Sequence, residues 1–434
     1  MAERIVAHLG LGAFHRAHQA WYTQHAADAG GWSLVGFTGR SPEQARILAR
    51  RRGAYTLLVR GPEVDAIEQI TVIRRAHDGA DRAAWEGALA DAAVTVLTLT
   101  ITEAGYRLDP RAPGGDAGRL DLADPAVRQD LRAPGTHGAV TAPVRIALGL
   151  DARRRAGAGP LEVISCDNLV GNGRLAGAVV LDAARAWEEA DPAAAGLTSW
   201  IEENVRFRSS MVDRITPRTV ADDLATAERL SGVRDEAVVV CEPFSEWLLE
   251  PGALPAPDWA SAGARIVDDL VPYEERKLRL LNGAHSLLAH HGLLHGLTDV
   301  AEAFADPRLR DLVEEYWETA AASCRLPDAE LAAAIEATRT RFANPRIRHR
   351  LAQIAEGAQH KLPQRILPVL RSAIAAGHAT DATASVVAAW ILGEERAGRG
   401  VDPDVLSTGD AALDERVRTL VDRALRRLDA SVVV

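Results

Sequence analysis

The stretch that most constrains the fold lies at the start of the chain, where an expected strand runs directly into a glycine turn. Arg4–Leu9 is a short apolar segment, Gly10 and Gly12 follow it, and a helix is expected over residues 17–29. Glycines in such a turn let a phosphate group approach the N-terminus of the following helix. His15 stands where a third glycine is usual. The pattern therefore favours a dinucleotide-binding unit, with a plain strand–turn–helix as the alternative.

Further segments rich in β-branched residues alternate with helical ones, which is typical of an open parallel sheet. We expect strands at residues 32–37, 56–59, 70–73, 94–100 and 161–166. Ligands of such sheets bind at the carboxyl ends of the strands. Glu103 and Asn168 follow two of these strands, and they could relay a proton and donate an amide hydrogen to a substrate oxygen. An exposed loop acid and a turn asparagine are the alternatives.

In a dinucleotide-binding fold, a residue after the second strand, here expected at residues 32–37, hydrogen-bonds the ribose of the cofactor. Glu43 is the acidic residue there, and a carboxylate at this place favours NAD. Arg40 would instead suit the 2′-phosphate of NADP. The chemistry of these two residues leaves the cofactor choice open.

The length of 434 residues exceeds one ordinary core, so we expect two domains, at residues 1–270 and 271–434. The formal net charge of -10 argues against a nucleic-acid-binding protein, because it offers no broad basic surface for phosphates. We find neither an apolar run of transmembrane length nor a signal peptide, and expect a cytoplasmic protein without membrane partners. The three cysteines are far apart, which indicates neither disulfides nor a metal site.

Residues 273–285 form a second informative stretch, in which Lys277, Asn282 and His285 stand among leucines. On a regular helix, Asn282 would lie about 140° and His285 about 80° from Lys277, so the three would share one side. A partly desolvated lysine has a lowered pKa and can exchange a proton with an alcohol, while the other two orient the oxygen. Gly283 would let a ligand approach the backbone. A snorkelling lysine, a capping asparagine and a core histidine fit the spacing equally well.

Residues 207–217, with Val212-Asp213-Arg214 at their centre, resemble the signature of the mannitol dehydrogenase family, the polyol-specific long-chain dehydrogenases and reductases. Further blocks that fit the family occur in the same order at residues 10–19, 100–106, 165–168, 241–244 and 277–285. The matched blocks extend from residue 4 to about residue 370, which is most of the chain.

This resemblance implies an α/β protein with an N-terminal Rossmann-type dinucleotide-binding domain, a mainly α-helical C-terminal domain and an active site between them. It implies a metal-independent, nicotinamide-dependent oxidoreductase. By matched position, Lys277 is the general acid/base, Asn168 and Asn282 polarise the reacting oxygen, His285 positions the substrate and Glu103 lies on a proton path.

The resemblance also implies a cofactor site. Its residues by matched position are Gly10, Gly12, Ala13, Phe14, His15, Arg16, Glu43 and Asp213. Members of the family carry a histidine in place of the third glycine, and Glu43 matches an aspartate that selects NAD. We therefore expect NAD, and Arg40 keeps NADP open.

The second half of the chain is helical in pattern and resembles the fructuronate reductase (D-mannonate oxidoreductase) branch more than mannitol 2-dehydrogenases. The cations available for a uronate carboxylate are Arg348, Arg350, Lys361 and Arg365, although each could be a surface charge. We expect interconversion of D-fructuronate and D-mannonate. Mannitol 2-dehydrogenase, another polyol dehydrogenase such as D-arabinitol 4-dehydrogenase, and a non-catalytic nucleotide-binding sensor are the alternatives.

The expected partners are a small sugar acid or polyol and at most further copies of the chain, in a monomer or small homo-oligomer. The chain ends earlier than typical members of the family, after a helical stretch from residue 402. We expect this shorter end to affect the oligomeric state or the openness of the site.

Overall fold

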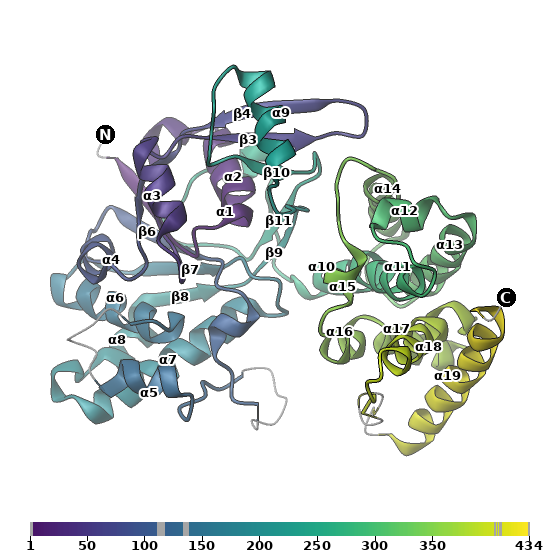
Figure 1. The fold of residues 1–434 in the computed structure, drawn as a ribbon. Helices are drawn as coiled ribbons and strands as arrows, with labels where there is room; N and C mark the ends of the chain where they lie inside the picture. Colours follow the sequence, from purple (N-terminus) through teal and green to yellow (C-terminus); the bar gives the residue numbers. More distant parts are fainter. Residues whose placement is uncertain are drawn as a thin grey trace. The chain divides into compact units, whose positions relative to one another are not determined.

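The computed structural model of the chain describes residues 3–110, 118–132, 139–402, 405, 407 and 410–432 (Figure 1). The chain divides into two compact units. Unit 1 comprises Met1–Arg60 and Val64–Leu270, and unit 2 comprises Gly61–Glu63 and Val271–Val434. In the part of the chain that is described, no helix has both the length and the apolar character needed to cross a membrane.

Unit 1 is built on a parallel six-stranded sheet in the order β5-β2-β1-β6-β7-β8. Its strands are β1 (Arg4–Leu9), β2 (Trp32–Phe37), β5 (Ile73–His77), β6 (Val94–Leu99), β7 (Leu161–Ser165) and β8 (Val205–Arg208). The strand order reverses direction at β1, as in doubly wound dinucleotide-binding folds. The predicted Rossmann-type fold is confirmed, and the carboxyl ends of β1, β6 and β7 lie at one edge of the sheet.

Helices cover both faces of this sheet, which explains why its central strands β1, β2, β6 and β7 are mostly apolar, whereas the edge strands β5 and β8 carry arginines. Ile5, Ala7 and Leu9 of β1 point into one core, and Val6 points into the other. The first core is covered by α4 (Arg82–Leu89), α5 (Pro125–Arg132), α6 (Ala142–Ala156), α7 (Asn172–Ala190) and α8 (Leu197–Asn204). Helices α1 (Ala13–Ala17), α2 (Gln19–His25) and α3 (Glu43–Arg50) contribute to the second. The expected helix over residues 17–29 was too long, because the backbone breaks at His18 and α2 ends at His25.

Two small sheets complete unit 1. One contains β3 (Tyr55–Arg60), β4 (Asp65–Ile70) and β10 (Val239–Cys241), and the other contains β9 (Ser210–Asp213), β11 (Glu246–Leu249) and β12 (Arg265–Ile266). Helix α9 (Ala221–Ser231) lies beside β3 and β4. The strand expected at residues 70–73 was wrong. The chain leaves the antiparallel β3–β4 pair at Ile70 and enters the parallel sheet at Ile73, so the apolar run spans two strands of different sheets.

Unit 2 is helical throughout its described part after residue 270, as predicted. Its helices are α10 (Val271–Arg276), α11 (Gly283–Leu294), α12 (Val300–Ala305), α13 (Pro307–Ala322), α14 (Asp328–Phe342), α15 (Leu351–Ala355), α16 (Ala358–Arg365), α17 (Leu367–Ala376), α18 (Asp381–Arg396) and α19 (Ala411–Val432). Helix α11 runs through the core and packs against α12, α13, α15 and α18. The content of glycine, proline and aspartate at residues 110–118 predicts a surface loop, most of which lies outside the described residues.

Candidate functional site

The glycine turn after β1 is fixed by close contacts with its neighbouring strands. Gly10 has a φ of +106°, and its N–H and that of Leu11 both donate to the Phe37 carbonyl at 2.9 Å. The Thr100 hydroxyl donates to the Gly10 carbonyl at 2.8 Å. A Cβ on Gly10 would lie 2.0 Å from the Thr100 carbonyl oxygen. Only glycine fits here, because both the backbone conformation and the approach of β6 exclude a side chain.

The rest of the predicted cofactor turn begins α1. Gly12, Ala13 and Phe14 are partly buried. His15 is buried and stacks on His8, with ring centroids 3.4 Å apart. Burial lowers the pKa of His8 to about 3 and, with the charge of His8, lowers the pKa of His15 well below its ordinary value. The two rings therefore form a neutral pair beneath the turn.

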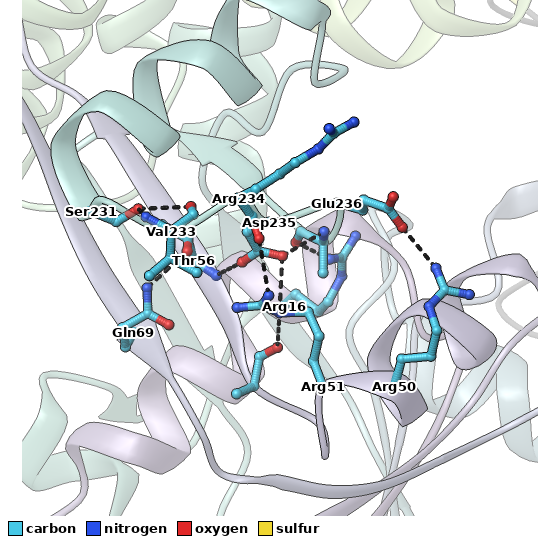
Figure 2. Close-up of polar contacts among 12 residues, drawn as sticks. Arg16, Arg50, Arg51, Thr56, Gln69, Ser231, Val233, Arg234, Asp235 and Glu236 are labelled. Carbon is cyan, nitrogen blue, oxygen red and sulfur yellow. Dashed lines mark hydrogen bonds and ion pairs between the residues drawn. The ribbon is translucent and has the colours of Figure 1, made fainter.

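The side chain of Arg16 also makes its contacts within the protein. Its Nε donates to the Gly12 carbonyl at 3.1 Å and its Nη1 to the Ala237 carbonyl at 2.6 Å. The guanidinium also lies over the ring of Tyr55, at 5.4 Å from the centroid. Figure 2 shows the side chain beside Asp235. Any contact of Arg16 with a cofactor stays a prediction.

Asp235 lies between Arg16 and the small sheet formed by β3, β4 and β10 (Figure 2). Its buried carboxylate accepts the N–H groups of Thr56 and Ala237 at 2.7 Å and pairs with Arg51 at 3.1 Å. A buried carboxylate with two amide donors and a cation is well compensated, so this cluster holds α3, β3 and the approach to β10 together.

The residues expected to select the cofactor lie on the surface of unit 1. Glu43 is the first residue of α3 and is exposed, and its N–H donates to the Ser41 hydroxyl at 3.3 Å. Arg40 is exposed as well. Both residues follow β2, where a residue that hydrogen-bonds the cofactor ribose is expected.

Glu103 and Asn168 follow the adjacent parallel strands β6 and β7, and both are exposed. Asp213 ends β9 and is buried. Asn172 is a residue that the sequence analysis did not single out for a role. Its side-chain amide donates to the Asp167 carbonyl at 2.7 Å and to the Ser210 carbonyl at 2.8 Å, which ties β9 to the end of β7.

In unit 2 the expectation of one regular helix over residues 273–285 was wrong. Lys277–Asn282 forms a π-helical segment (η5), and α11 begins at Gly283. In a π-helix the N–H of residue i+5 donates to the carbonyl of residue i, as Gly283 does here to Leu278. A π-helix has more residues per turn than a regular helix, so Asn282 lies closer to the side of Lys277 than the 140° expected for a regular helix.

Two side chains of α13 hold this π-helical segment. The Tyr316 hydroxyl donates to the Arg279 carbonyl at 2.7 Å, and the Trp317 indole N–H donates to the Leu280 carbonyl at 2.9 Å. A Cβ on Gly283 would lie 1.9 Å from the Tyr316 hydroxyl oxygen. We expected this glycine to admit a ligand to the backbone, and that was wrong, because Tyr316 occupies the approach.

His285 lies in a cluster of basic side chains. Its ring is buried against Phe342 and His349, with centroid distances of 4.6 and 4.8 Å. Burial lowers the pKa of His285 well below its ordinary value. The charges that lower this pKa further are those of His349, Arg341, Arg365 and Lys277. The imidazole is therefore neutral, with one nitrogen a donor and the other an acceptor.

In this part of unit 2, three polar atoms are buried without a hydrogen-bond partner among the described residues: Nδ2 of Asn282, Nε2 of His285 and Nδ1 of His349. A buried polar group without a partner costs about 1–3 kcal/mol. Lys277, one turn before Asn282, is partly buried. A ligand oxygen that met these groups would remove the cost, so the arrangement suits a hydroxyl or carbonyl ligand.

The four predicted substrate cations fall into two classes. Arg365 lies near α11, where its guanidinium donates to the Ser286 hydroxyl at 3.3 Å, and Lys361 donates to the Ile354 carbonyl at 3.1 Å. Arg348 and Arg350 are exposed. The structure thus brings Arg365 to the cluster and directs Arg348 and Arg350 towards solvent.

Sequence reasoning missed His349 and Arg341. The chain around His349 is irregular, because the His349 N–H donates to the Ile347 carbonyl at 3.0 Å and α15 begins at Leu351. The contact of its ring with His285 depends on the tertiary fold, so no local pattern of the sequence indicates it. Arg341 is buried near the end of α14, where the helical pattern alone does not separate it from surface arginines.

Lysine is nearly absent from the chain. Of its 50 lysine and arginine residues only Lys277 and Lys361 are lysines, and both lie in unit 2. Arginine stays protonated in proteins, whereas a lysine amine can release and recover its proton. Lysine at position 277 is therefore compatible with proton exchange, as is the second lysine, Lys361. The sequence analysis did not use this signal.

Across the described residues, no three histidine, cysteine, aspartate or glutamate side chains are grouped so that they could hold a metal ion. Cys166, Cys241 and Cys324 are free. The groups gathered in unit 2 are therefore an amine, an amide, imidazoles and guanidinium groups. Such groups can transfer a proton, donate hydrogen bonds to an oxygen and attract an anion.

Known proteins match the chain over most of its length. Residues 3–261 match the mannitol dehydrogenase Rossmann domain, and residues 269–425 match the mannitol dehydrogenase C-terminal domain. The chain is 35% identical to D-mannonate oxidoreductase of Escherichia coli (strain K12), over 92% of this chain and 82% of that protein. It is 36% identical to D-arabinitol 4-dehydrogenase of Ralstonia nicotianae, over 93% of this chain and 86% of that protein.

A solved structure gives the same result. The ternary complex of Pseudomonas fluorescens mannitol 2-dehydrogenase with NAD and D-mannitol superimposes with a TM-score of 0.82 at 29% identity, over 100% of this chain and 93% of that one. The two domain matches follow one another along the chain, as the motifs do. The chain therefore belongs to the mannitol dehydrogenase family of oxidoreductases.

Proposed function

We propose that the protein is an NAD-dependent oxidoreductase that interconverts D-fructuronate and D-mannonate. The observation that carries this proposal is the basic cluster around His285. The charges of Arg341, Arg365 and Lys277 all act on this one buried imidazole, and His349 contacts it. Such a concentration of positive charge suits a substrate with a carboxylate, which a guanidinium can bind with two parallel hydrogen bonds. A neutral polyol gives no such compensation.

Gly10 supports nucleotide binding, because its positive φ and the close Thr100 carbonyl allow only glycine in the tight turn that leads from β1 to α1. Gly10, Gly12, Ala13, Phe14 and the backbone of His15 and Arg16 would hold the dinucleotide, with Glu43 at the ribose and Asp213 near the nicotinamide. The bound nicotinamide supplies the hydride chemistry. We favour NAD over NADP on Glu43, and we propose the cytoplasm as the compartment on the sequence features given above.

The proposed proton chemistry belongs to Lys277. In the oxidation direction its neutral amine takes the hydroxyl proton of the substrate, and in the reduction direction its ammonium returns one. Asn168 and Asn282 donate amide hydrogens to the oxygen on which charge develops, and His285 orients it. Glu103 is exposed and so can exchange a proton with solvent.

A second candidate is oxidation of a neutral polyol, as in D-arabinitol 4-dehydrogenase or mannitol 2-dehydrogenase. The observation in its favour is the 36% identity to the former, which equals the similarity to D-mannonate oxidoreductase for practical purposes. A nucleotide-binding sensor without catalysis is less well supported, because Lys277, Asn282 and His285 are all present in one cluster.

The test is a substrate panel of D-mannonate, D-mannitol and D-arabinitol with NAD and with NADP. We expect the highest kcat/KM for D-mannonate with NAD. Arg365→Gln should raise the KM for D-mannonate on the order of tenfold or more, since it removes a charged hydrogen-bond donor, and should change the KM of polyols far less. Arg308→Gln, at an exposed arginine on α13, is the matched control. Turnover of polyols alone would reject the proposal.

A further inference from the structure

Thr102, in the segment after β6, has a backbone conformation that threonine rarely adopts. Thr102 has a φ of +66° and a ψ of 161°, a region that essentially only glycine adopts. Threonine is β-branched, which makes this conformation more strained still. A strained backbone conformation persists only where contacts with the surrounding structure stabilise it. The contacts of Thr102 therefore identify the stabilising group.

The carboxylate of Asp167 is what holds the strained residue. One oxygen accepts the Thr102 N–H at 2.8 Å, and the other accepts the Ile101 N–H at 3.2 Å and the Tyr106 hydroxyl at 2.9 Å. Asp167 is buried, and hydrogen bonds to a buried carboxylate are the strong kind. These three donors come from residues 101–106, so they fix the whole turn, and the Ser165 hydroxyl is a fourth donor to the same carboxylate at 3.5 Å.

Tyr106 is suited to its part as a donor. Burial and the charge of Asp167 raise the pKa of the Tyr106 hydroxyl well above its ordinary value, so the hydroxyl keeps its proton. It also bonds to the Ser165 hydroxyl at 2.6 Å. Tyr106 therefore couples the turn after β6 to the last residue of β7.

The position of Asp167 in the chain connects this hydrogen-bond network to two proposed site residues. Asp167 directly precedes Asn168, and the strained Thr102 directly precedes Glu103. One carboxylate thus joins the two segments that carry the proposed oxygen-polarising amide and the proposed proton-relay acid of unit 1. Both segments lie at the carboxyl ends of neighbouring parallel strands.

Asp130 provides a comparison within the same unit. Its carboxylate is also buried and accepts two backbone N–H groups, from Val140 at 3.1 Å and Thr141 at 2.7 Å, and the Thr141 hydroxyl at 2.6 Å. The Thr141 backbone is ordinary, with a φ of -84°. The hydrogen-bond pattern is similar in both places, and only Asp167 uses it to hold a strained backbone beside proposed site residues.

We propose that Asp167 is a positioning residue for the reaction, which holds the strained turn at Thr102 so that Glu103 is presented beside Asn168. The inference rests on the proposed function. Loss of the Asp167 carboxylate lets the turn relax into an unstrained conformation, and Glu103 then leaves the place from which it relays a proton.

The experiment is a double-mutant cycle of Asp167→Asn and Glu103→Gln, run with whichever sugar acid or polyol the wild type oxidises. A misplacement of about 1 Å costs on the order of 10²-fold in rate. We expect Asp167→Asn to lower kcat by about that factor with little change in the Kd of NADH. In the Glu103→Gln background the same substitution should lower kcat less than about threefold, because the group it positions is already absent.

Asp130→Asn is the matched control, and we expect it to lower stability without lowering the kcat of the folded enzyme. Should Asp167→Asn not fold, Tyr106→Phe removes one donor to the same carboxylate and should show a smaller loss with the same dependence on Glu103. Multiplicative losses in the cycle, or an unchanged kcat in Asp167→Asn, would overturn the inference. So would wild-type turnover in Glu103→Gln, whereas the dehydrogenase assignment stands or falls with wild-type activity alone.

Discussion

Lys277 differs from the other basic residues near it in the property that proton transfer needs. Its neighbours Arg341 and Arg365 keep their protons at any pH the protein tolerates. A lysine amine can exist in both forms, and the proposed chemistry uses both. At the scale of a single residue, the proposed acid/base role thus depends on position 277 holding one of the chain's two lysines and not an arginine.

Arg16 shows the opposite case, a residue whose motif predicts one role and whose contacts indicate another. Its guanidinium donates to the carbonyls of Gly12 and Ala237 and lies over Tyr55. These contacts fix the start of α1 against the rest of unit 1. The motif can require arginine for this reason, because the turn that meets a nucleotide depends on a rigid support.

At the scale of elements, the π-helical segment sets which side chains meet. It turns Asn282 towards the side of Lys277, and α13 stabilises it, because Tyr316 and Trp317 donate to two of its carbonyls. Segments of this kind occur frequently at functional sites. The geometry of the proposed site therefore depends on two buried rings that need not touch a substrate.

Gly283 and Tyr316 give a test of this dependence. Gly283→Ala places a methyl group 1.9 Å from the Tyr316 hydroxyl oxygen and should destabilise unit 2 by about 1–3 kcal/mol, as overpacking does. Tyr316→Phe loses one hydrogen bond, which costs about 1 kcal/mol. In the double variant the alanine should cost clearly less than alone, because the hydroxyl is gone. Urea unfolding followed by circular dichroism measures these differences.

Gly393→Ala is the control for the helix itself, since a Cβ there meets no atom within 4 Å. It should stabilise α18 by up to about 1 kcal/mol through helix propensity. Additive effects of Gly283→Ala and Tyr316→Phe would contradict the proposed clamp on the π-helical segment.

The sequence predicted those features that depend on neighbours in the chain. The strands Arg4–Leu9 and Trp32–Phe37 have their expected bounds because each is a mostly apolar segment that ends before a glycine or polar residue. The π-helical segment was not predictable in this way, because its donors lie 37 residues further along. The break between Ile70 and Ile73 depends on which sheet each strand joins, and a local pattern does not contain that information.

At the scale of the whole molecule, both units bury neutral histidines. Burial lowers the pKa of His8 and His291 to about 3 and the pKa of His290 and His349 to about 4. In the unfolded chain each has its ordinary value of about 6.5. Below pH 6.5 these histidines therefore bind protons in the unfolded chain but stay neutral in the folded units. The free energy of unfolding falls as the pH falls from about 6.5 towards 4, and these histidines do not change it above that range.

This linkage predicts acid sensitivity in both units. Each such histidine should cost about 2 kcal/mol at pH 5, so the midpoint of urea unfolding should decrease steeply between pH 6.5 and 5 and stay level between pH 7 and 8. His291→Gln should reduce the slope below pH 6 by about 1.4 kcal/mol per pH unit, which corresponds to one proton. Equal midpoints at pH 7 and pH 5 would contradict burial of these rings as neutral groups.

The residues of the proposed reaction are divided between the two units. Unit 1 carries the glycine turn and the Asp167 network, and unit 2 carries the amine and the basic cluster. Each set is supported by its own core, as the separate clusters of buried residues indicate. A variant in one unit can therefore remove a step of the reaction while the other unit stays folded.

The most direct measurement is the turnover of D-mannonate with NAD by Lys277→Arg, which keeps the charge and most of the bulk of the side chain but cannot give up its proton. We predict that kcat falls by a factor on the order of 10² to 10⁴, the usual contribution of a general acid/base. Binding of NADH, followed by its fluorescence, should remain close to that of the wild type. A Lys277→Arg variant that turns over at near the wild-type rate would contradict proton exchange at Lys277.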